Sequence, residues 1–161
     1  MSKSLQGKSA IVTGGSRGIG KGIAEELAKC GVKVLITYAS ASEAAQKVVA
    51  GIKSSGGEAA ALQANCMSEE SPEKIVRATM DAFGGGIDII INNAGVGDEV
   101  FLKDETYEHF DKMFYTNVRF PMFLVKASLP YLQRGGRIVN VGSVVARQGM
   151  QALDLTIIAI R

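Results

Sequence analysis

Glycines at fixed offsets (Gly14, Gly18 and Gly20) surround Arg17 in the stretch TGGSRGIG, near the start of the chain. This stretch follows a short apolar run and precedes a segment with helical spacing. A helix that begins there presents unpaired backbone N–H groups and the positive end of its dipole, which together favour phosphate. Glycine also lets the backbone turn sharply and approach a ligand closely, because it has no Cβ. The stretch therefore predicts a site for the pyrophosphate of a dinucleotide.

Small and polar residues follow two later apolar runs of the chain. Asn92-Asn93-Ala94-Gly95 comes directly after the run 87–91, and Gly142-Ser143 comes directly after the run 137–141. Ligands of open parallel sheets bind at the carboxyl ends of the strands, which meet at one edge. We therefore expect both groups to lie on the same edge as the glycine turn.

The elements that would position these groups alternate between strands and helices. Short β-branched runs predict strands, and apolar residues at helical spacing predict helices. Short glycine-rich connections between them favour a parallel sheet covered by helices on both faces. A chain of 161 residues suits a single domain. The expected strands are 9–12, 32–38, 58–64, 87–91 and 137–141, and the expected helices are 19–28, 43–53 with Ser42 as its cap, 71–83, and about 107–132.

Composition argues against several classes of function. The formal net charge of +2 is too small to indicate a nucleic-acid partner. The apolar runs are far shorter than the roughly 20 residues of a membrane span, and the first residues lack the apolar core of a secretory signal. Cys30 and Cys66 lack metal-site spacing, so we interpret them as reduced thiols. These features predict a cytoplasmic protein with no membrane partner and no metal.

The glycine turn and Asn92-Asn93-Ala94-Gly95 together resemble the short-chain dehydrogenase/reductase family, from about residue 6 to about residue 147. The wider pattern is most similar to β-ketoacyl carrier-protein reductases and fungal polyketide ketoreductases. The resemblance implies an α/β fold: a Rossmann-like, doubly wound parallel sheet in a single domain over 1–161, truncated on its C-terminal side. Residues 148–161 depart from the family pattern. The family also implies a homo-oligomer, a dimer or tetramer in which the long helix packs against a neighbouring subunit.

The resemblance assigns cofactor-binding roles residue by residue. The glycine turn would hold the pyrophosphate and adenosine ribose, Asn92-Ala94-Gly95 would support the centre of the cofactor, and Asn65 would accept from the adenine amine in place of the usual aspartate. Cys66 would contribute only its backbone. The complete set is Gly14, Ser16, Arg17, Gly18, Ile19, Gly20, Tyr38, Ala39, Ser40, Asn65, Cys66, Asn92, Ala94 and Gly95.

The end of the second strand indicates which cofactor is used. Folds that bind NAD usually place an acid there, which accepts from the ribose 2′-hydroxyl. Here the strand ends in Tyr38-Ala39-Ser40, and no acid occurs before Glu43. The Ser40 hydroxyl and the Arg17 guanidinium could instead bind a 2′-phosphate, with Tyr38 near the adenine. We therefore expect NADP(H). The alternative is that Arg17 is a solvated surface charge.

Catalytic roles are implied for two residues by the same resemblance. Ser143 matches the serine that holds the substrate oxygen, and Asn117 matches the asparagine that anchors a water relay. The family's Tyr-x-x-x-Lys pair is absent, because no tyrosine is followed by lysine four positions later. Two hypotheses remain open: an NADPH-dependent reductase of ketones or 3-oxoacyl-type carbonyls, and a non-catalytic NADP-binding or subunit-interaction fragment.

The acidic residues between 98 and 105 and the nearby histidine suggest no chemistry. We interpret Asp98, Glu99, Asp104 and Glu105 as a solvated edge near the substrate side, because no histidine interleaves them as a metal site would require. His109 is interpreted as a surface residue of the long helix rather than a base.

Overall fold

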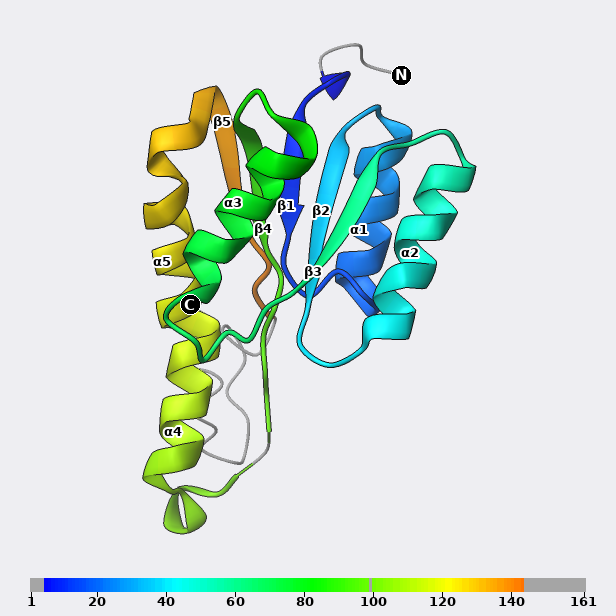
Figure 1. Cartoon of the computed structure of the whole chain (residues 1–161). Helices are drawn as coiled ribbons and strands as arrows, with labels where there is room; N and C mark the ends of the chain where they lie inside the picture. The colour runs from blue at the N-terminus through cyan, green and yellow to red at the C-terminus, as the bar shows by residue number, and fades with distance from the viewer. Residues whose placement is uncertain (1–4, 99, 144–161) are drawn as a thin grey trace.

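Five parallel strands form one sheet, in the order β3-β2-β1-β4-β5. The computed structural model describes residues 5–98 and 100–143, so the expectations for 148–161 lie outside the described residues. The strand order places β1 and β4 side by side in the centre, and all strands end at the same edge (Figure 1). The strands are β1 (Ser9–Val12), β2 (Lys33–Tyr38), β3 (Ala59–Gln63), β4 (Ile87–Asn92) and β5 (Leu132–Asn140).

Helices cover the two faces of this sheet in pairs (Figure 1). The first pair is α1 (Gly18–Lys29) and α2 (Ser42–Ser54), and the second is α3 (Ser71–Phe83) and α5 (Phe120–Ser128). The helices α1 and α2 share one core cluster with Ala10 and Val12 of β1. The helices α3 and α5 pack against Ile11 on the opposite face. This alternation follows from the strand geometry, in which successive side chains point to opposite faces.

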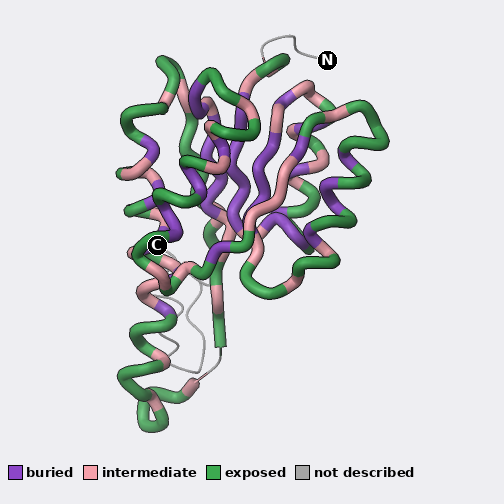
Figure 2. Tube along the Cα trace, viewed as in Figure 1, coloured by how far each residue is buried: buried purple, intermediate pink, exposed green. Residues whose placement is uncertain are grey.

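The central strands are buried along almost their whole length (Figure 2). All four residues of β1 are buried, as expected for a short apolar strand that is covered on both faces. The helix α4 (Tyr107–Phe114) differs, since it extends beyond the carboxyl edge of the sheet and buries only Met113 (Figures 1 and 2). The fold thus projects one helix past the edge at which the candidate site residues were expected.

The parallel, helix-covered sheet confirms the fold class that the sequence predicted, and the helix predicted over about 107–132 is helical from Tyr107 to Tyr131 but changes type along its length. A π-helical turn over Tyr115–Arg119 separates α4 from α5, and a 3-10 turn over Leu129–Tyr131 follows Ser128. Figure 1 shows that the segments still form one continuous rod. The sequence pattern is uniformly helical there, so it does not reveal the wider turn.

Two local predictions also need correction. Ser42 is the first residue of α2 rather than its cap, and its hydroxyl lies 3.3 Å from the Tyr38 hydroxyl, so it is engaged with β2. The last strand begins at Leu132 instead of residue 137, with a register shift: Leu132 pairs with Ile87, but Arg137 pairs with Ile89. Gly135 and Gly136 lie in this irregular part of β5, and Gly135 has a φ of +82°.

Candidate functional site

The glycine turn lies between β1 and α1, at the carboxyl edge of the sheet (Figure 1). Gly14 has a φ of +66°, and a Cβ there would lie 3.1 Å from the Ala94 Cα. A Cβ on Gly20 would overlap both the Gly14 carbonyl oxygen and the Asn93 side-chain amide. These two glycines are therefore required by backbone conformation and by close approach to the segment after β4.

Hydrogen bonds fasten the turn to strands on both sides. Towards β2, the backbone N–H of Gly14 donates to the Thr37 hydroxyl at 3.3 Å, and that of Gly15 donates to the Thr37 carbonyl at 3.0 Å. Towards β4, the Thr13 hydroxyl accepts from the backbone N–H groups of Asn93 at 3.0 Å and Ala94 at 2.9 Å. The turn is thus held in a fixed shape at the start of α1.

Asn93 completes this attachment through its side-chain amide. Its Nδ2 donates to the backbone oxygens of Thr13 at 2.9 Å and Gly14 at 3.2 Å. Neither Asn93 nor the Thr13 hydroxyl was among the residues that the sequence predicted for the site, although their neighbours were. The signal that could have found them is that each lies inside one of the two motifs.

The exposed residues of the turn are free to meet a ligand at the surface. Arg17 precedes α1 in an extended conformation with a φ of −157° and is exposed, as is Gly18, while Ser16 is buried. Ile19 exposes 66% of its surface in the first turn of α1, which is unusual for so large an apolar residue. An apolar surface beside helical N–H groups suits a nucleotide ligand.

The residues expected on the adenosine side lie at the ends of β2 and β3. Tyr38 is half-buried, and Ala39 and Ser40 are exposed beyond it. Asn65 follows β3, and its Oδ1 accepts from the Met67 backbone N–H at 2.9 Å. An amide oxygen has two lone pairs, so one remains for a ligand.

Beside Asn65, Cys66 is half-buried and packs against the core cluster on the face of the sheet that α3 and α5 cover. Burial raises the pKa of Cys66 to about 11, so the thiol stays protonated and has no nucleophilic character at neutral pH. The interpretation of Cys66 as a residue without side-chain chemistry agrees with this environment.

A cavity of about 760 Å³ opens at the carboxyl ends of β4 and β5. It is lined by Asn92, the segment 93–97, Asn117 of the π-helical turn, apolar residues of α5, and Ser143 beyond β5. Buried Asn92 donates from Nδ2 to the Asn140 Oδ1 at 2.8 Å, and its own Oδ1 has no hydrogen-bond partner among the described residues. A buried acceptor without a donor in a cavity wall favours a ligand that carries a donor.

The structure therefore brings the predicted site residues to the carboxyl edge of the sheet, except that the Cys66 side chain packs on the face that α3 and α5 cover. The glycine turn follows β1, the segment Tyr38–Ser40 lies at the end of β2, and Asn65 follows β3. Asn92 ends β4, and Ser143 and Asn117 line the cavity. Within residues 5–98 and 100–143, no three His, Cys, Asp or Glu side chains gather as a metal site. In the same ranges, no helix has the length and apolar character needed to cross a membrane.

Comparison with known proteins provides an independent test of this arrangement. The family model described as short chain dehydrogenase matches residues 8–154. The short-chain dehydrogenase/reductase FrzI of Cladobotryum sp is 49% identical over 152 residues, which are 94% of this chain and 58% of that protein. Tetrahydroxynaphthalene reductase of Pyricularia oryzae is 39% identical, over 91% of this chain and 51% of that protein. The chain thus spans little more than half the length of these relatives.

A solved structure agrees with the fold as well. A short chain dehydrogenase from Burkholderia cenocepacia J2315, in complex with NADP, is 42% identical and superposes with a TM-score of 0.90. The match covers 96% of this chain and 62% of that protein. Sequence and structure therefore lead to the same family.

Proposed function

We propose that this chain, which belongs to the short-chain dehydrogenase family, binds NADP(H) for the reduction of a ketone or 3-oxoacyl-type carbonyl. One observation carries the proposal: the Thr13 hydroxyl fastens the glycine turn to Asn93 and Ala94, so that turn and cavity share one edge. The reductase names of relatives and the NADP bound to a solved neighbour support the same chemistry.

The residues present fit a dinucleotide that lies across the sheet edge. The turn would hold the pyrophosphate at the start of α1, with the adenosine half towards Tyr38 and Ser40 at the end of β2. The opposite half would then extend towards the cavity at β4 and β5, where the unpaired Oδ1 of Asn92 can accept a hydrogen bond. Bound NADPH supplies a hydride, and the chain supplies binding and orientation.

The selection of NADP(H) would depend on Arg17 and Ser40. Both are exposed and no carboxylate occurs at the end of β2, so a 2′-phosphate meets a guanidinium and a hydroxyl without a repelling charge. Titration by cofactor fluorescence tests this selection. We expect NADPH to bind more tightly than NADH, and Arg17→Ala to weaken NADPH by about tenfold or more, since such a contact is worth about 1.5–3 kcal/mol.

Lys21→Ala is the matched control, because it removes an exposed cation from the same helix, where Lys21 faces Glu25 at 3.8 Å. This variant should leave the affinity for NADPH close to that of the parent chain. Equal weakening of NADPH and NADH by Arg17→Ala, or a parent chain that prefers NADH, would show that Arg17 does not read the 2′-phosphate.

At the cavity, Ser143 is proposed to hold the carbonyl oxygen of the substrate and Asn117 to support the site from the π-helical turn. Reduction also needs a proton donor, and general acid catalysis typically contributes 10²–10⁴-fold in rate. The family pair Tyr-x-x-x-Lys does not occur in the 161-residue sequence. A second candidate function, an NADP(H)-binding module without catalysis, would need no such donor.

An assay of NADPH consumption with a β-ketoester separates the two candidates. The 161-residue chain is compared with a longer form that carries Tyr-x-x-x-Lys downstream of Ser143. We expect the longer form to be at least about 10²-fold faster and to lose this activity in Ser143→Ala. Equal rates from both forms would place the proton donor elsewhere.

A homo-oligomer and a cytoplasmic location also belong to the proposal. The apolar side chains of Met122 and Leu129 on and beyond α5 each expose 61% of their surface, which supports contact with another copy. The cytoplasmic location stays a prediction from the sequence.

A further inference from the structure

The segment Gly95–Asp98 leaves the end of β4 and forms one wall of the cavity. Val96 and Gly97 line the cavity together with Ser143, which follows β5. The segment has no helical or strand structure, so its position must come from side-chain contacts. Two separate sets of contacts attach it to the rod formed by α4 and the π-helical turn.

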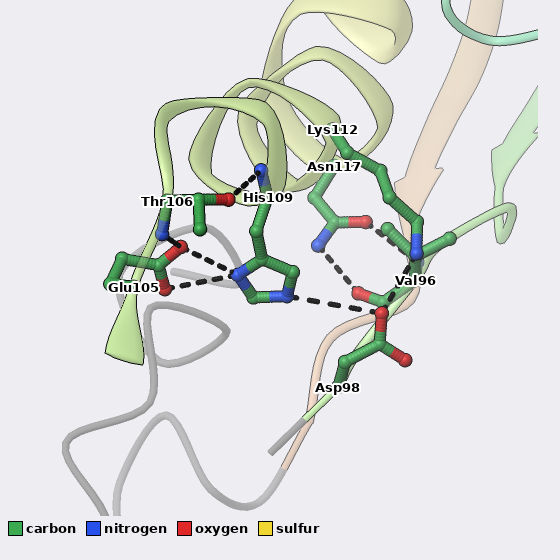
Figure 3. A network of polar contacts seen from close by, with 7 residues as sticks. All are labelled: Val96, Asp98, Glu105, Thr106, His109, Lys112 and Asn117. Atoms are coloured by element: carbon green, nitrogen blue, oxygen red, sulfur yellow. Dashed lines mark hydrogen bonds and ion pairs between the residues drawn. The ribbon is translucent and has the colours of Figure 1, made fainter. Parts of the chain in front are cut away.

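The first attachment is a reciprocal pair between Asn117 and the backbone of Val96. The Val96 N–H donates to the Asn117 Oδ1 at 2.9 Å, and the Asn117 Nδ2 donates to the Val96 carbonyl at 2.8 Å (Figure 3). The side chain therefore satisfies both polar groups of one residue, as a neighbouring strand would. This contact fixes the segment at one point.

The second attachment holds the carboxylate of Asp98. The Lys112 Nζ donates to Asp98 Oδ2 at 2.8 Å, and the His109 Nε2 faces the same oxygen at 3.8 Å. Figure 3 shows both groups reaching Asp98 from α4. The Lys112 hydrogen bond and charge lower the pKa of Asp98, with a smaller effect of His109, so the carboxylate is ionised at neutral pH.

His109 is itself held in place by the residues that start α4. Its Nδ1 lies 2.8 and 2.9 Å from the two oxygens of Glu105, and its backbone N–H donates to the Thr106 hydroxyl at 3.1 Å. The Glu105 carboxylate also accepts from the Thr106 N–H at 2.9 Å. With 14% and 13% of their side chains exposed, His109 and Glu105 do not lie on the solvated surface that the sequence suggested.

The remaining ring nitrogen of His109 points at the cavity segment. The buried Nε2 has no hydrogen-bond partner among the described residues, and Asp98 is the charged group in front of it (Figure 3). Glu105 prevents the ring from turning away, because it contacts the opposite edge. The His109 ring therefore links the start of α4, through Glu105, to the Asp98 carboxylate.

We propose that Glu105, His109 and Lys112 form a clamp on Asp98, and that this Asp98 clamp positions the segment Gly95–Asp98 as a wall of the carbonyl-binding cavity. Glu105, His109 and Lys112 are positioning residues, since they hold Asp98 and thereby the neighbouring cavity residues Val96 and Gly97. The role in carbonyl binding rests on the proposed function, whereas the clamping of the segment does not. Its loss should affect the cavity end of the site and leave the glycine turn intact.

Hydrogen exchange of the Val96 amide measures the clamp directly in the 161-residue chain. Loss of both contacts in the double variant His109→Phe, Lys112→Met should speed this exchange about 1.5-fold to fivefold, the range expected when an exposed ion pair such as Lys112–Asp98 is lost. The amide of Gly15, bonded to Thr37 in the turn, should keep its rate. Unchanged exchange of Val96 in the double variant would overturn the proposal.

Lys74→Met is the matched control for the charge. Lys74 pairs with Glu70 at 2.7 Å on α3 and its side chain is similarly exposed, but it lies away from the cavity. It should leave the Val96 amide unchanged. If Lys74→Met speeds exchange as much as the double variant does, the effect is a general loss of stability and the clamp is overturned.

Two conservative variants separate the two edges of the His109 ring. His109→Gln can reach the position of Nε2 and keep the contact with Asp98, while His109→Asn can reach the position of Nδ1 and keep the contact with Glu105. The Gln variant should protect the Val96 amide better than the Asn variant does. The reverse order would mean that His109 only stabilises the start of α4.

A pair of ligands connects the clamp to the site. The double variant should weaken NADPH about threefold or more and leave the affinity for 2′,5′-ADP unchanged, because 2′,5′-ADP lacks the half that extends to the cavity. Equal weakening of both ligands would overturn a role confined to the cavity. If the parent chain binds neither ligand, the proposed function is refuted. The hydrogen-exchange rate of the Val96 amide still decides in that case whether the clamp exists.

Discussion

The Thr13 hydroxyl lies 2.9 Å from the backbone nitrogen of Ala94 and accepts its hydrogen, which joins the end of β1 to the segment after β4. The same oxygen accepts from the Asn93 N–H, so a single side chain satisfies two neighbouring backbone donors. Thr13 is almost fully buried, with 1% of its surface exposed. A buried side chain thus fixes the shape of the candidate ligand site from beneath.

Replacement of Thr13 by valine keeps the shape of the side chain and removes this acceptor. Two partly buried N–H groups then lack a partner, and we expect Thr13→Val to lower the free energy of unfolding by about 1–3 kcal/mol. Urea denaturation measures the change. Thr13→Ser keeps the hydroxyl and should be the milder variant, and a valine variant as stable as the parent would show that these hydrogen bonds contribute nothing net.

Two glycines of α1 should respond in opposite ways to alanine. A Cβ on Gly20 overlaps the Gly14 carbonyl oxygen and the Asn93 amide, whereas a Cβ on Gly22 meets nothing within 4 Å. Gly20→Ala should therefore destabilise the fold and weaken NADPH, while Gly22→Ala should stabilise it by up to about 1 kcal/mol through helix propensity. Thermal unfolding and NADPH titration of both variants check this contrast. Similar effects at both positions would contradict the close packing around Gly20.

The reactivity of Cys66 should be low because burial raises the pKa of its thiol to about 11. Only the thiolate reacts with iodoacetamide, so at pH 8 Cys66 should be alkylated roughly 10²-fold more slowly than a free cysteine. The rate should rise about tenfold per pH unit up to pH 10. Mass spectrometry of the peptide that contains Cys66 measures this rate, and a plateau below pH 9 would contradict the effect of burial.

The stability contributed by the Asp98 carboxylate should depend on pH in one direction. The Lys112 hydrogen bond and charge lower the pKa of Asp98 in the folded protein. The contribution is therefore fully present above the ordinary aspartate value and is lost as the pH falls through the lowered pKa. Denaturation of the parent and Lys112→Met should show a difference at pH 7 that disappears in strong acid. A difference that grows on acidification would have the wrong sign.

Periodicity and glycine placement predicted the elements that carry the site. The apolar runs around Ile11 and Ile90 are short and nearly continuous, which is typical of strands covered on both faces. The side chains of Ile11 and Ile90 are fully buried. The first helix was expected over 19–28 and spans Gly18–Lys29, and Gly31 follows it with a φ of +81°, as is common after a helix end. Because parallel strands share one carboxyl edge, the places of Gly14 and Asn92 follow from the order of the elements alone.

The features that the sequence did not predict depend on contacts between distant residues. The π-helical turn carries Asn117 to the backbone of Val96, and nothing in the local pattern around Asn117 encodes that partner. Serine is a residue type that commonly caps helices, but the Ser42 hydroxyl forms a hydrogen bond with the Tyr38 hydroxyl instead. His109 and Glu105 have the spacing of an exposed helical pair, yet only 14% and 13% of their side chains are exposed, and His109 faces Asp98 from a distant part of the sequence. Propensity cannot anticipate such tertiary effects.

The contacts of Asn93 with Thr13 join positions 80 residues apart in the chain, and this separation has a consequence for folding order. During synthesis, the glycine turn leaves the ribosome long before the strand that braces it. Its final conformation must wait until β4 has docked beside β1, a slow non-local step in which loop closure precedes any gain. Binding of a dinucleotide to the turn therefore indicates that β1 and β4 have already paired. A cofactor that recognises only this late shape adds its binding free energy to the last stage of folding.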